Sequence, residues 1–234
     1  MRRIARFVFP MAATLLVAVA AQKVVFADYI FATLEDGKVR FALLDNANGK
    51  PNPQYESYVT GLAPLCAGKT LTLSTREGAA YTELPKGVVA KKGVVTAEKV
   101  VGIRERGGEK YLLVYHAKGA ATLAAASAVT KVPAEVSARR SGEKLIIAVR
   151  QAGKLVPDSE VWVQWPGDET TNATGIKTNA KGEVEVAWPT GDALKSGFIS
   201  IRAKVNEVKD GELEGQKYPL IRRWATLTFP VTAG

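Results

Sequence analysis

The chain has 234 residues, which is enough for one large domain or two small ones, and a formal net charge of +9. It contains one cysteine and one histidine, so an internal disulfide and any site that needs two of either residue are excluded. Its basic residues are scattered among acidic ones rather than gathered with aromatic residues in a stripe. Nucleic acid is therefore not an expected partner.

The first 27 residues have the order of a secretory signal peptide. Arg2, Arg3 and Arg6 precede an apolar run that closes on small residues at 18–20 or at 25–27, and we prefer cleavage after Ala27. The run is too short, and too interrupted at Pro10, to span a membrane, so we expect no span in the mature chain. Cleavage after Ala27 would remove four basic and no acidic side chains, which lowers the net charge to +5. The sequence predicts a periplasmic or extracellular protein.

Alternating apolar and polar residues, with turns at short intervals, predict β strands in residues 28–132. The expected strands of this first domain are 28–34, 38–44, 70–75, 94–104 and 110–117. An Ala-rich segment at 118–128 is the expected helical turn or linker, and we place the domain boundary between residues 132 and 133.

The same pattern continues through residues 133–234 and predicts a second domain of the same class. Its expected strands are 144–151, 159–165, 175–179, 183–188, 197–208 and 220–231. Regular short strands of this kind are typical of two packed sheets. The expected fold is all-β, with two antiparallel β-sandwich-like domains after a cleaved signal peptide.

Strand parity separates two tryptophans from the expected core. Trp162 shares a strand face with Glu160 and Gln164, and Trp224 shares one with Arg222. Aromatic faces beside hydrogen-bonding groups suit a sugar ring or an extended peptide, so these five residues are the candidate ligand-binding residues. The alternative is that the neighbouring domain, or the loop at 210–218, covers both tryptophans.

Three segments resemble ligand-binding motifs without meeting their requirements. Residues 63–70 fit a relaxed P-loop pattern, but residues 71–75 alternate like a strand instead of opening a helix, so we expect a hairpin turn and no nucleotide. Residues 45–49 fail as a calcium loop because alanine occupies the second ligand position. Residues 209–217 are expected to be a solvated polar loop. We expect no metal and no cofactor.

The sequence offers no catalytic constellation. Cys66 lies in an apolar segment, and His116 ends the apolar stretch 111–116, where a structural histidine is expected. Nothing in the sequence places two carboxylates in one pocket. We therefore expect a protein that is not an enzyme.

Two resemblances extend this interpretation. Residues 152–163 and 177–184 are similar to carboxypeptidase-regulatory-like, transthyretin-like and bacterial Ig-like sandwich modules. The mature chain, at 28–31, 110–115 and 222–229, resembles an uncharacterised family of exported bacterial proteins grouped with periplasmic components of nickel and cobalt uptake. Members of that family often carry histidine at the mature start and before the last strand. This chain has none there, so the resemblance supplies no metal site.

The expected function is that of an exported, non-catalytic binding or accessory module of the bacterial cell envelope, related to metal-uptake components by resemblance. Its expected partner is an envelope protein or a glycan. One alternative is a carbohydrate-binding module that uses Trp162 and Trp224. Another is an envelope hydrolase.

Overall fold

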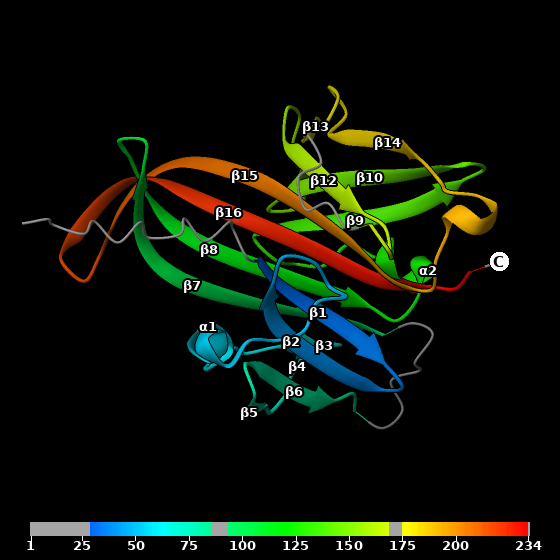
Figure 1. Cartoon of the computed structure of the whole chain (residues 1–234). Helices are drawn as coiled ribbons and strands as arrows, with labels where there is room; N and C mark the ends of the chain where they lie inside the picture. The colour runs from blue at the N-terminus through cyan, green and yellow to red at the C-terminus, as the bar shows by residue number, and fades with distance from the viewer. Residues whose placement is uncertain (1–28, 86–92, 169–174, 234) are drawn as a thin grey trace, which may run out of the picture.

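A computed structural model describes residues 29–85, 93–168 and 175–233 (Figure 1). The expected signal peptide lies outside these ranges. Within them, β strands form three sheets, and the few helices are single turns. None of these described helices has the length and apolar character to cross a membrane. The predicted all-β, sandwich-like fold class is confirmed.

An eight-stranded sheet runs through the whole molecule (Figure 1). Its strands, in spatial order, are β13 (Ile176–Lys177), β12 (Glu160–Gln164), β15 (Gly197–Leu213), β16 (Gln216–Val231), β8 (Glu109–Ala120), β7 (Val94–Arg106), β3 (Leu65–Cys66) and β4 (Lys69–Thr70). Strands β16 and β8 pair in parallel, whereas the other neighbours pair antiparallel. The sheet is thus continuous across the expected division at residues 132 and 133, and that division stays a prediction.

Two smaller sheets pack against this central sheet. One contains β1 (Tyr29–Glu35), β2 (Lys38–Leu44), β6 (Ala79–Glu83) and β5 (Ser74–Arg76); the other contains β9 (Ala134–Ser141), β10 (Lys144–Gln151), β11 (Lys154–Leu155) and β14 (Glu183–Ala187). Along β16, Trp224 packs against the first core cluster, whereas Ala225 and Leu227 belong to the second. Because neighbouring side chains point to opposite faces, the small sheets cover opposite faces of the central one.

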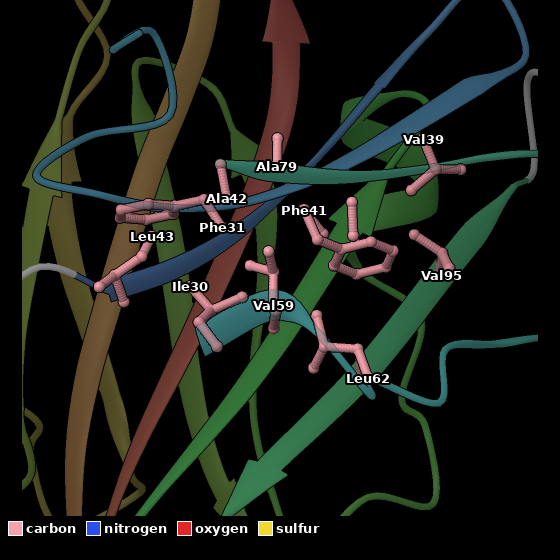
Figure 2. Close-up of a cluster of buried hydrophobic side chains, with 14 of the residues drawn as sticks. Ile30, Phe31, Val39, Phe41, Ala42, Leu43, Val59, Leu62, Ala79 and Val95 are labelled. Carbon is pink, nitrogen blue, oxygen red and sulfur yellow. The ribbon is translucent and has the colours of Figure 1, made fainter. Parts of the chain in front are cut away.

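The core under the first small sheet is formed mainly by β1 and β2. Figure 2 shows Phe31 and Phe41 together with Val59, and all three side chains are fully buried. Val59 comes from α1 (Glu56–Val59), a single turn that follows the 3-10 turn η1 (Pro53–Tyr55). Neither turn is expected from the sequence, because one helical turn is too short to show periodicity.

Six hairpins close through the same kind of two-residue loop. Both loop residues have a left-handed φ at Asp36-Gly37, Ala67-Gly68, Glu77-Gly78, Gly107-Gly108, Ala152-Gly153 and Glu214-Gly215. Such loops match the right-handed twist of the flanking strands. The segment that resembles a P-loop is the expected hairpin, β3–β4, and the chain after it has no regular structure until β5 begins at Ser74.

Several segments differ from the sequence-based expectation. The expected strand at 70–75 is divided, because β4 ends at Thr70 and β5 begins at Ser74, and β6 and β9 are not among the expected strands. The Ala-rich segment contains the expected helical turn, α2 (Leu123–Ala126), which is capped by Thr122, but its first residues belong to β8, which continues to Ala120. The expected polar loop at 209–217 is instead the end of the β15–β16 hairpin. The end of this hairpin is exposed to water on both faces, so its residues are mostly charged and lack the apolar alternation that identifies a strand in a sequence. A last 3-10 turn, η2 (Gly191–Ala193), precedes β15.

A buried ion pair joins β8 of the central sheet to β9 of the second small sheet. Lys118 on β8 and Glu135 on β9 are 2% and 1% exposed, and their charged atoms lie 3.4 Å apart. The Lys118 ammonium also donates to the carbonyl oxygens of Ala128 and Val136, and the Glu135 carboxylate accepts from the backbone and hydroxyl of Thr130. Burial lowers the pKa of Lys118, and Glu135 opposes that shift.

Candidate functional site

The two candidate tryptophans lie together on one face of the central sheet. Trp162 on β12 pairs with Arg202 on β15, and Trp224 on β16 pairs with Lys204, two residues further along β15. The centroids of the two tryptophan rings are 5.4 Å apart, at an interplanar angle of 46°. Both side chains are half-buried. The face they share is the one covered by the first small sheet.

Two residues that the sequence does not single out complete this group. The Tyr29 ring meets the Trp224 ring edge-on at 4.8 Å, and the Arg202 guanidinium lies 4.6 Å from the Tyr29 ring and 5.6 Å from the Trp162 ring. Burial lowers the pKa of Arg202, and Tyr29 and Asp45 oppose the shift. We call Tyr29, Trp162, Arg202 and Trp224 the aromatic–arginine cluster. Rings in edge-on or tilted contact, and a guanidinium close to a ring, attract one another.

The flat faces of the cluster are largely occupied by the protein itself. A Cβ atom added to Gly175 would lie 2.9 Å from Cε2 and Cζ2 of Trp162, so the backbone before β13 already covers that ring. Tyr29 and Trp162 both contact Trp224. Tyr29 belongs to the expected neighbouring domain, whereas Gly175 lies in the same expected domain as Trp162, so the alternative of cover by the neighbouring domain applies to Trp224.

The three polar candidates have partners within the chain. Glu160 forms an ion pair with Lys204 on the neighbouring strand. Gln164 is buried and donates from Nε2 to the carbonyl oxygen of Asp168 at 3.1 Å. Glu160 and Gln164 therefore lie beside Trp162 on β12, but their polar groups already bind other residues of the chain.

Arg222 lies two residues from Trp224 and turns away from the cluster. Its guanidinium carbon lies 4.0 Å from the centroid of the Tyr111 ring, and it bonds Asn206 and Glu109. Whether any of the five candidates contacts a ligand stays a prediction.

Residues 45–49, which we name the cover loop, lie over β15 beside the cluster. The backbone N–H of Ala47 donates to Ser200 Oγ at 2.8 Å, and the side chain of Asn48 bonds the backbone of Phe198. Arg202 donates to the carbonyl oxygen of Asp45 at 3.3 Å. The segment considered as a calcium loop is thus a docking element that holds two sandwich layers together.

His116 is 3% exposed and is held in one tautomer. Arg223 can only donate, so its Nη1, 3.3 Å from His116 Nε2, requires that nitrogen to accept and puts the proton on Nδ1. His116 Nδ1 lies 3.3 Å from Glu98 Oε2 but without hydrogen-bond geometry. Burial, with Arg223 beside it, lowers the pKa of His116 to about 3. A ring whose accepting nitrogen faces a guanidinium is poorly placed to act as a base.

The described part of the chain brings no three His, Cys, Asp or Glu side chains together as a metal site. Cys66 is buried, and burial raises the pKa of its thiol. A raised pKa keeps the thiol protonated and weakly nucleophilic.

Beyond both small sheets, the central sheet continues as two projecting hairpins (Figure 1). We call them the arm: residues 103–112 of β7 and β8, and residues 207–221 of β15 and β16. Leu112, Val114 and Ile221 form a small core at its base, against which Leu213 and Tyr218 pack. An open pocket with a volume of about 550 Å³ lies along the end of the arm, and it is lined by Asp210, Gly211, Glu212, Lys217, Tyr218 and Pro219. Val208 beside it is 92% exposed.

Sequence patterns find the tryptophans and miss Tyr29, Arg202 and the arm. Arg202 shares its strand parity with other outward residues, but its two aromatic neighbours come from other strands. Only knowledge of the strand order would place them together.

No protein-family model and no curated protein matches this chain, so the resemblance to an exported family stays a prediction. Among solved structures, the chain is similar to the D0-D1 domain of intimin, at 14% identity over 86% of this chain and 96% of that one, with a TM-score of 0.25. It is also similar to a chimeric titin Z1Z2 functionalized with a KLER peptide from decorin, at 12% identity over 88% and 95%, with a TM-score of 0.20. Likeness this distant carries no argument about function.

Proposed function

We propose that this chain is an exported, non-catalytic binding or accessory module of the bacterial cell envelope, and that it binds a protein partner through the arm. The observation that supports this most directly is the arm itself. It carries its own small core, so it projects as a folded element, and its end combines exposed Val208 with charges of both signs. An apolar centre with a polar rim is the usual anatomy of a protein-binding surface.

The carbohydrate alternative is supported less well. A sugar platform needs an open aromatic face, whereas Trp162 lies against Gly175 and Trp224 lies against Tyr29. The hydrolase alternative has no positive support, because His116, the one histidine of the chain, faces Arg223.

Two measurements test the proposal. The chain is produced with its natural start, and the N-terminus of the exported form is sequenced; we expect Asp28, or Ala21 if an earlier site is cut, and an intact Met1 in the cytoplasm would contradict export. A photo-crosslinking residue is then placed at position 208, with position 129 as the matched control, since Val129 is also an exposed apolar residue at 56%. We expect one specific envelope-protein adduct from position 208 alone. Equal labelling from both positions would contradict binding by the arm.

A further inference from the structure

The side-chain amide of Asn48 joins the cover loop to β15, in addition to the bonds that the loop makes with Ser200 and Arg202. Asn48 Oδ1 accepts from the backbone N–H of Phe198, and Asn48 Nδ2 donates to the carbonyl oxygen of Phe198, both at 2.8 Å. The carboxamide thus bonds the strand as a neighbouring backbone would. It uses a donor and an acceptor at the same time, which no carboxylate can do.

The residue before Phe198 is shaped to admit this amide. Gly197 has φ +147°, and a Cβ atom there would lie 2.9 Å from Asn48 Oδ1 and 3.0 Å from Cβ of Pro166. Any larger residue would push the carboxamide away and strain the backbone. The start of β15 therefore contains a docking position that fits Asn48.

Asn48 also precedes Gly49, and this is the only Asn-Gly pair in the sequence. Asparagine is among the thermally labile residues, and a following glycine offers no side chain to hinder attack by its backbone nitrogen. We infer that Asn48 is a site of spontaneous deamidation and that docking on Phe198 controls its rate.

The reaction needs only water. The backbone nitrogen of Gly49 attacks Cγ of Asn48 and forms a new N–Cγ bond. The Cγ–Nδ2 bond then breaks, and ammonia leaves with the proton from Gly49. Water opens the resulting succinimide to aspartate or isoaspartate. No oxidant, reductant or enzyme takes part, and the side chain is exposed, so water has access.

Docking opposes the attack in two ways. The N–H of Gly49 is turned towards Asn46 and donates to its carbonyl oxygen at 3.1 Å, while both polar atoms of the Asn48 side chain are held by Phe198. The reaction therefore proceeds from the undocked loop, whose population depends on local opening.

The product cannot dock again. Deamidation replaces the Nδ2 donor by an oxygen, which would face the carbonyl oxygen of Phe198 and add a negative charge. An acceptor that faces an acceptor costs free energy instead of stabilising the contact. The change removes the contact of residue 48 with Phe198 and leaves the loop bound to β15 through Ser200 and Arg202, so we expect a weaker cover beside the aromatic–arginine cluster.

Peptide mass mapping of the mature chain tests this inference. Folded and urea-denatured samples are incubated at 37 °C and pH 8, and Asp and isoAsp are measured at position 48. We expect the folded rate to be at least about tenfold lower than the denatured rate. Asn46 and Asn179, which both precede alanine, are internal controls expected to react slowly in both samples. Equal folded and denatured rates at position 48 would overturn the inference.

Variants separate docking from general stability. Gly197→Ala should raise the rate of deamidation at position 48 in the folded protein several-fold. Gly102→Ala, at another glycine with a positive φ (+115°), should leave this rate unchanged. Ser200→Ala removes the bond to Ala47 without backbone strain and should also raise the rate, even if Gly197→Ala does not fold. Unchanged rates in Ser200→Ala, and in Gly197→Ala where it folds, would mean that docking does not control the reaction.

Discussion

The hydroxyl of Thr226 on β16 donates to the carbonyl oxygen of Ile30 on β1, at 2.7 Å. Among the described strands, β1 pairs with β2 on one edge and with no strand on the other. Thr228 makes the same kind of bond to Ala32, so threonines of the central sheet satisfy the carbonyls of the other edge. Gly119 makes this approach possible, because a Cβ atom there would collide with Ala32. The two layers are thus joined by side-chain hydrogen bonds as well as by apolar packing.

Thr226→Val should lower the free energy of unfolding by about 1–3 kcal/mol, because a buried carbonyl loses its donor while the side-chain shape is kept. Urea denaturation measures the change. Thr75→Val, at an exposed strand position, is the control and should stay within about 0.5 kcal/mol. Equal effects of the two substitutions would show that the bond to Ile30 contributes nothing.

Lys118→Met should lower the free energy of unfolding by about 3–5 kcal/mol, since it leaves the Glu135 carboxylate buried without its cation. The double variant Lys118→Met with Glu135→Leu should recover much of the loss, because a well-packed apolar pair replaces the ion pair. Denaturation of the single and double variants measures both. A double variant as unstable as the single one would contradict this account.

His116 should make stability depend on pH in the acid range. Its pKa is about 3 in the fold and 6.5 unperturbed. Between these values the unfolded chain binds a proton that the folded chain does not, so stability falls as pH falls from 6.5 towards 3. The total is about 4–5 kcal/mol at 1.4 kcal/mol per unit, an upper value because the Glu98 carboxylate nearby favours the protonated ring.

Since His116 is the one histidine, a single imidazole signal in the NMR spectrum reports its titration. We expect no titration between pH 8 and 4.5, and a flatter stability profile for His116→Gln. A midpoint near 6.5 would contradict the burial argument.

Trp224→Ala should cost about 3–5 kcal/mol of stability, as truncation of a large packed side chain does. The reason is its contact with Tyr29, Trp162 and the first core cluster. Trp162→Ala should be costly as well, because Gly175 and Arg202 pack on its ring. Leu155→Ala, at a residue that is 44% exposed, is the control. A loss of less than about 1 kcal/mol in the free energy of unfolding for both variants would contradict this account and favour an exposed ligand-binding surface.

Nickel, cobalt and zinc should not bind tightly to the mature chain. The sequence has one histidine and one cysteine, and both methionines precede residue 28. These metals bind best to sites that combine several nitrogen or sulfur ligands. Calorimetric titration of the mature protein measures the affinity. Submicromolar binding of any of the three would contradict the expectation and favour the metal-uptake resemblance.

Local chemistry explains what the sequence predicts well. The β1–β2 hairpin follows from Asp36-Gly37, a dipeptide typical of two-residue turns, and β10 has the predicted bounds of 144–151. Parity separates Trp162 and Trp224 from the core residues of their own strands, because alternation is a property of each strand alone. Their common face follows from the order of β12, β15 and β16, which the sequence does not predict.

Contacts between distant segments explain what the sequence does not predict. The parallel pairing of β8 with β16, the ion pair of Lys118 with Glu135 and the docking of Asn48 on Phe198 each join parts of the chain with no shared local pattern. Exposure explains the miss at 209–217, since a strand wet on both faces lacks the apolar alternation that identifies strands.

The position of β16 in the chain sets the order in which the molecule can be completed. A polypeptide that emerges from a ribosome delivers its strands in sequence, and β16 comes after all the other described strands. Trp224 belongs to the first core and Phe229 to the second, so neither core closes until residues near 231 are available. Chains that stop short of β16 should therefore remain sensitive to proteases, whereas complete chains should acquire resistance in both halves together. Both cores therefore close together, once β16 is available.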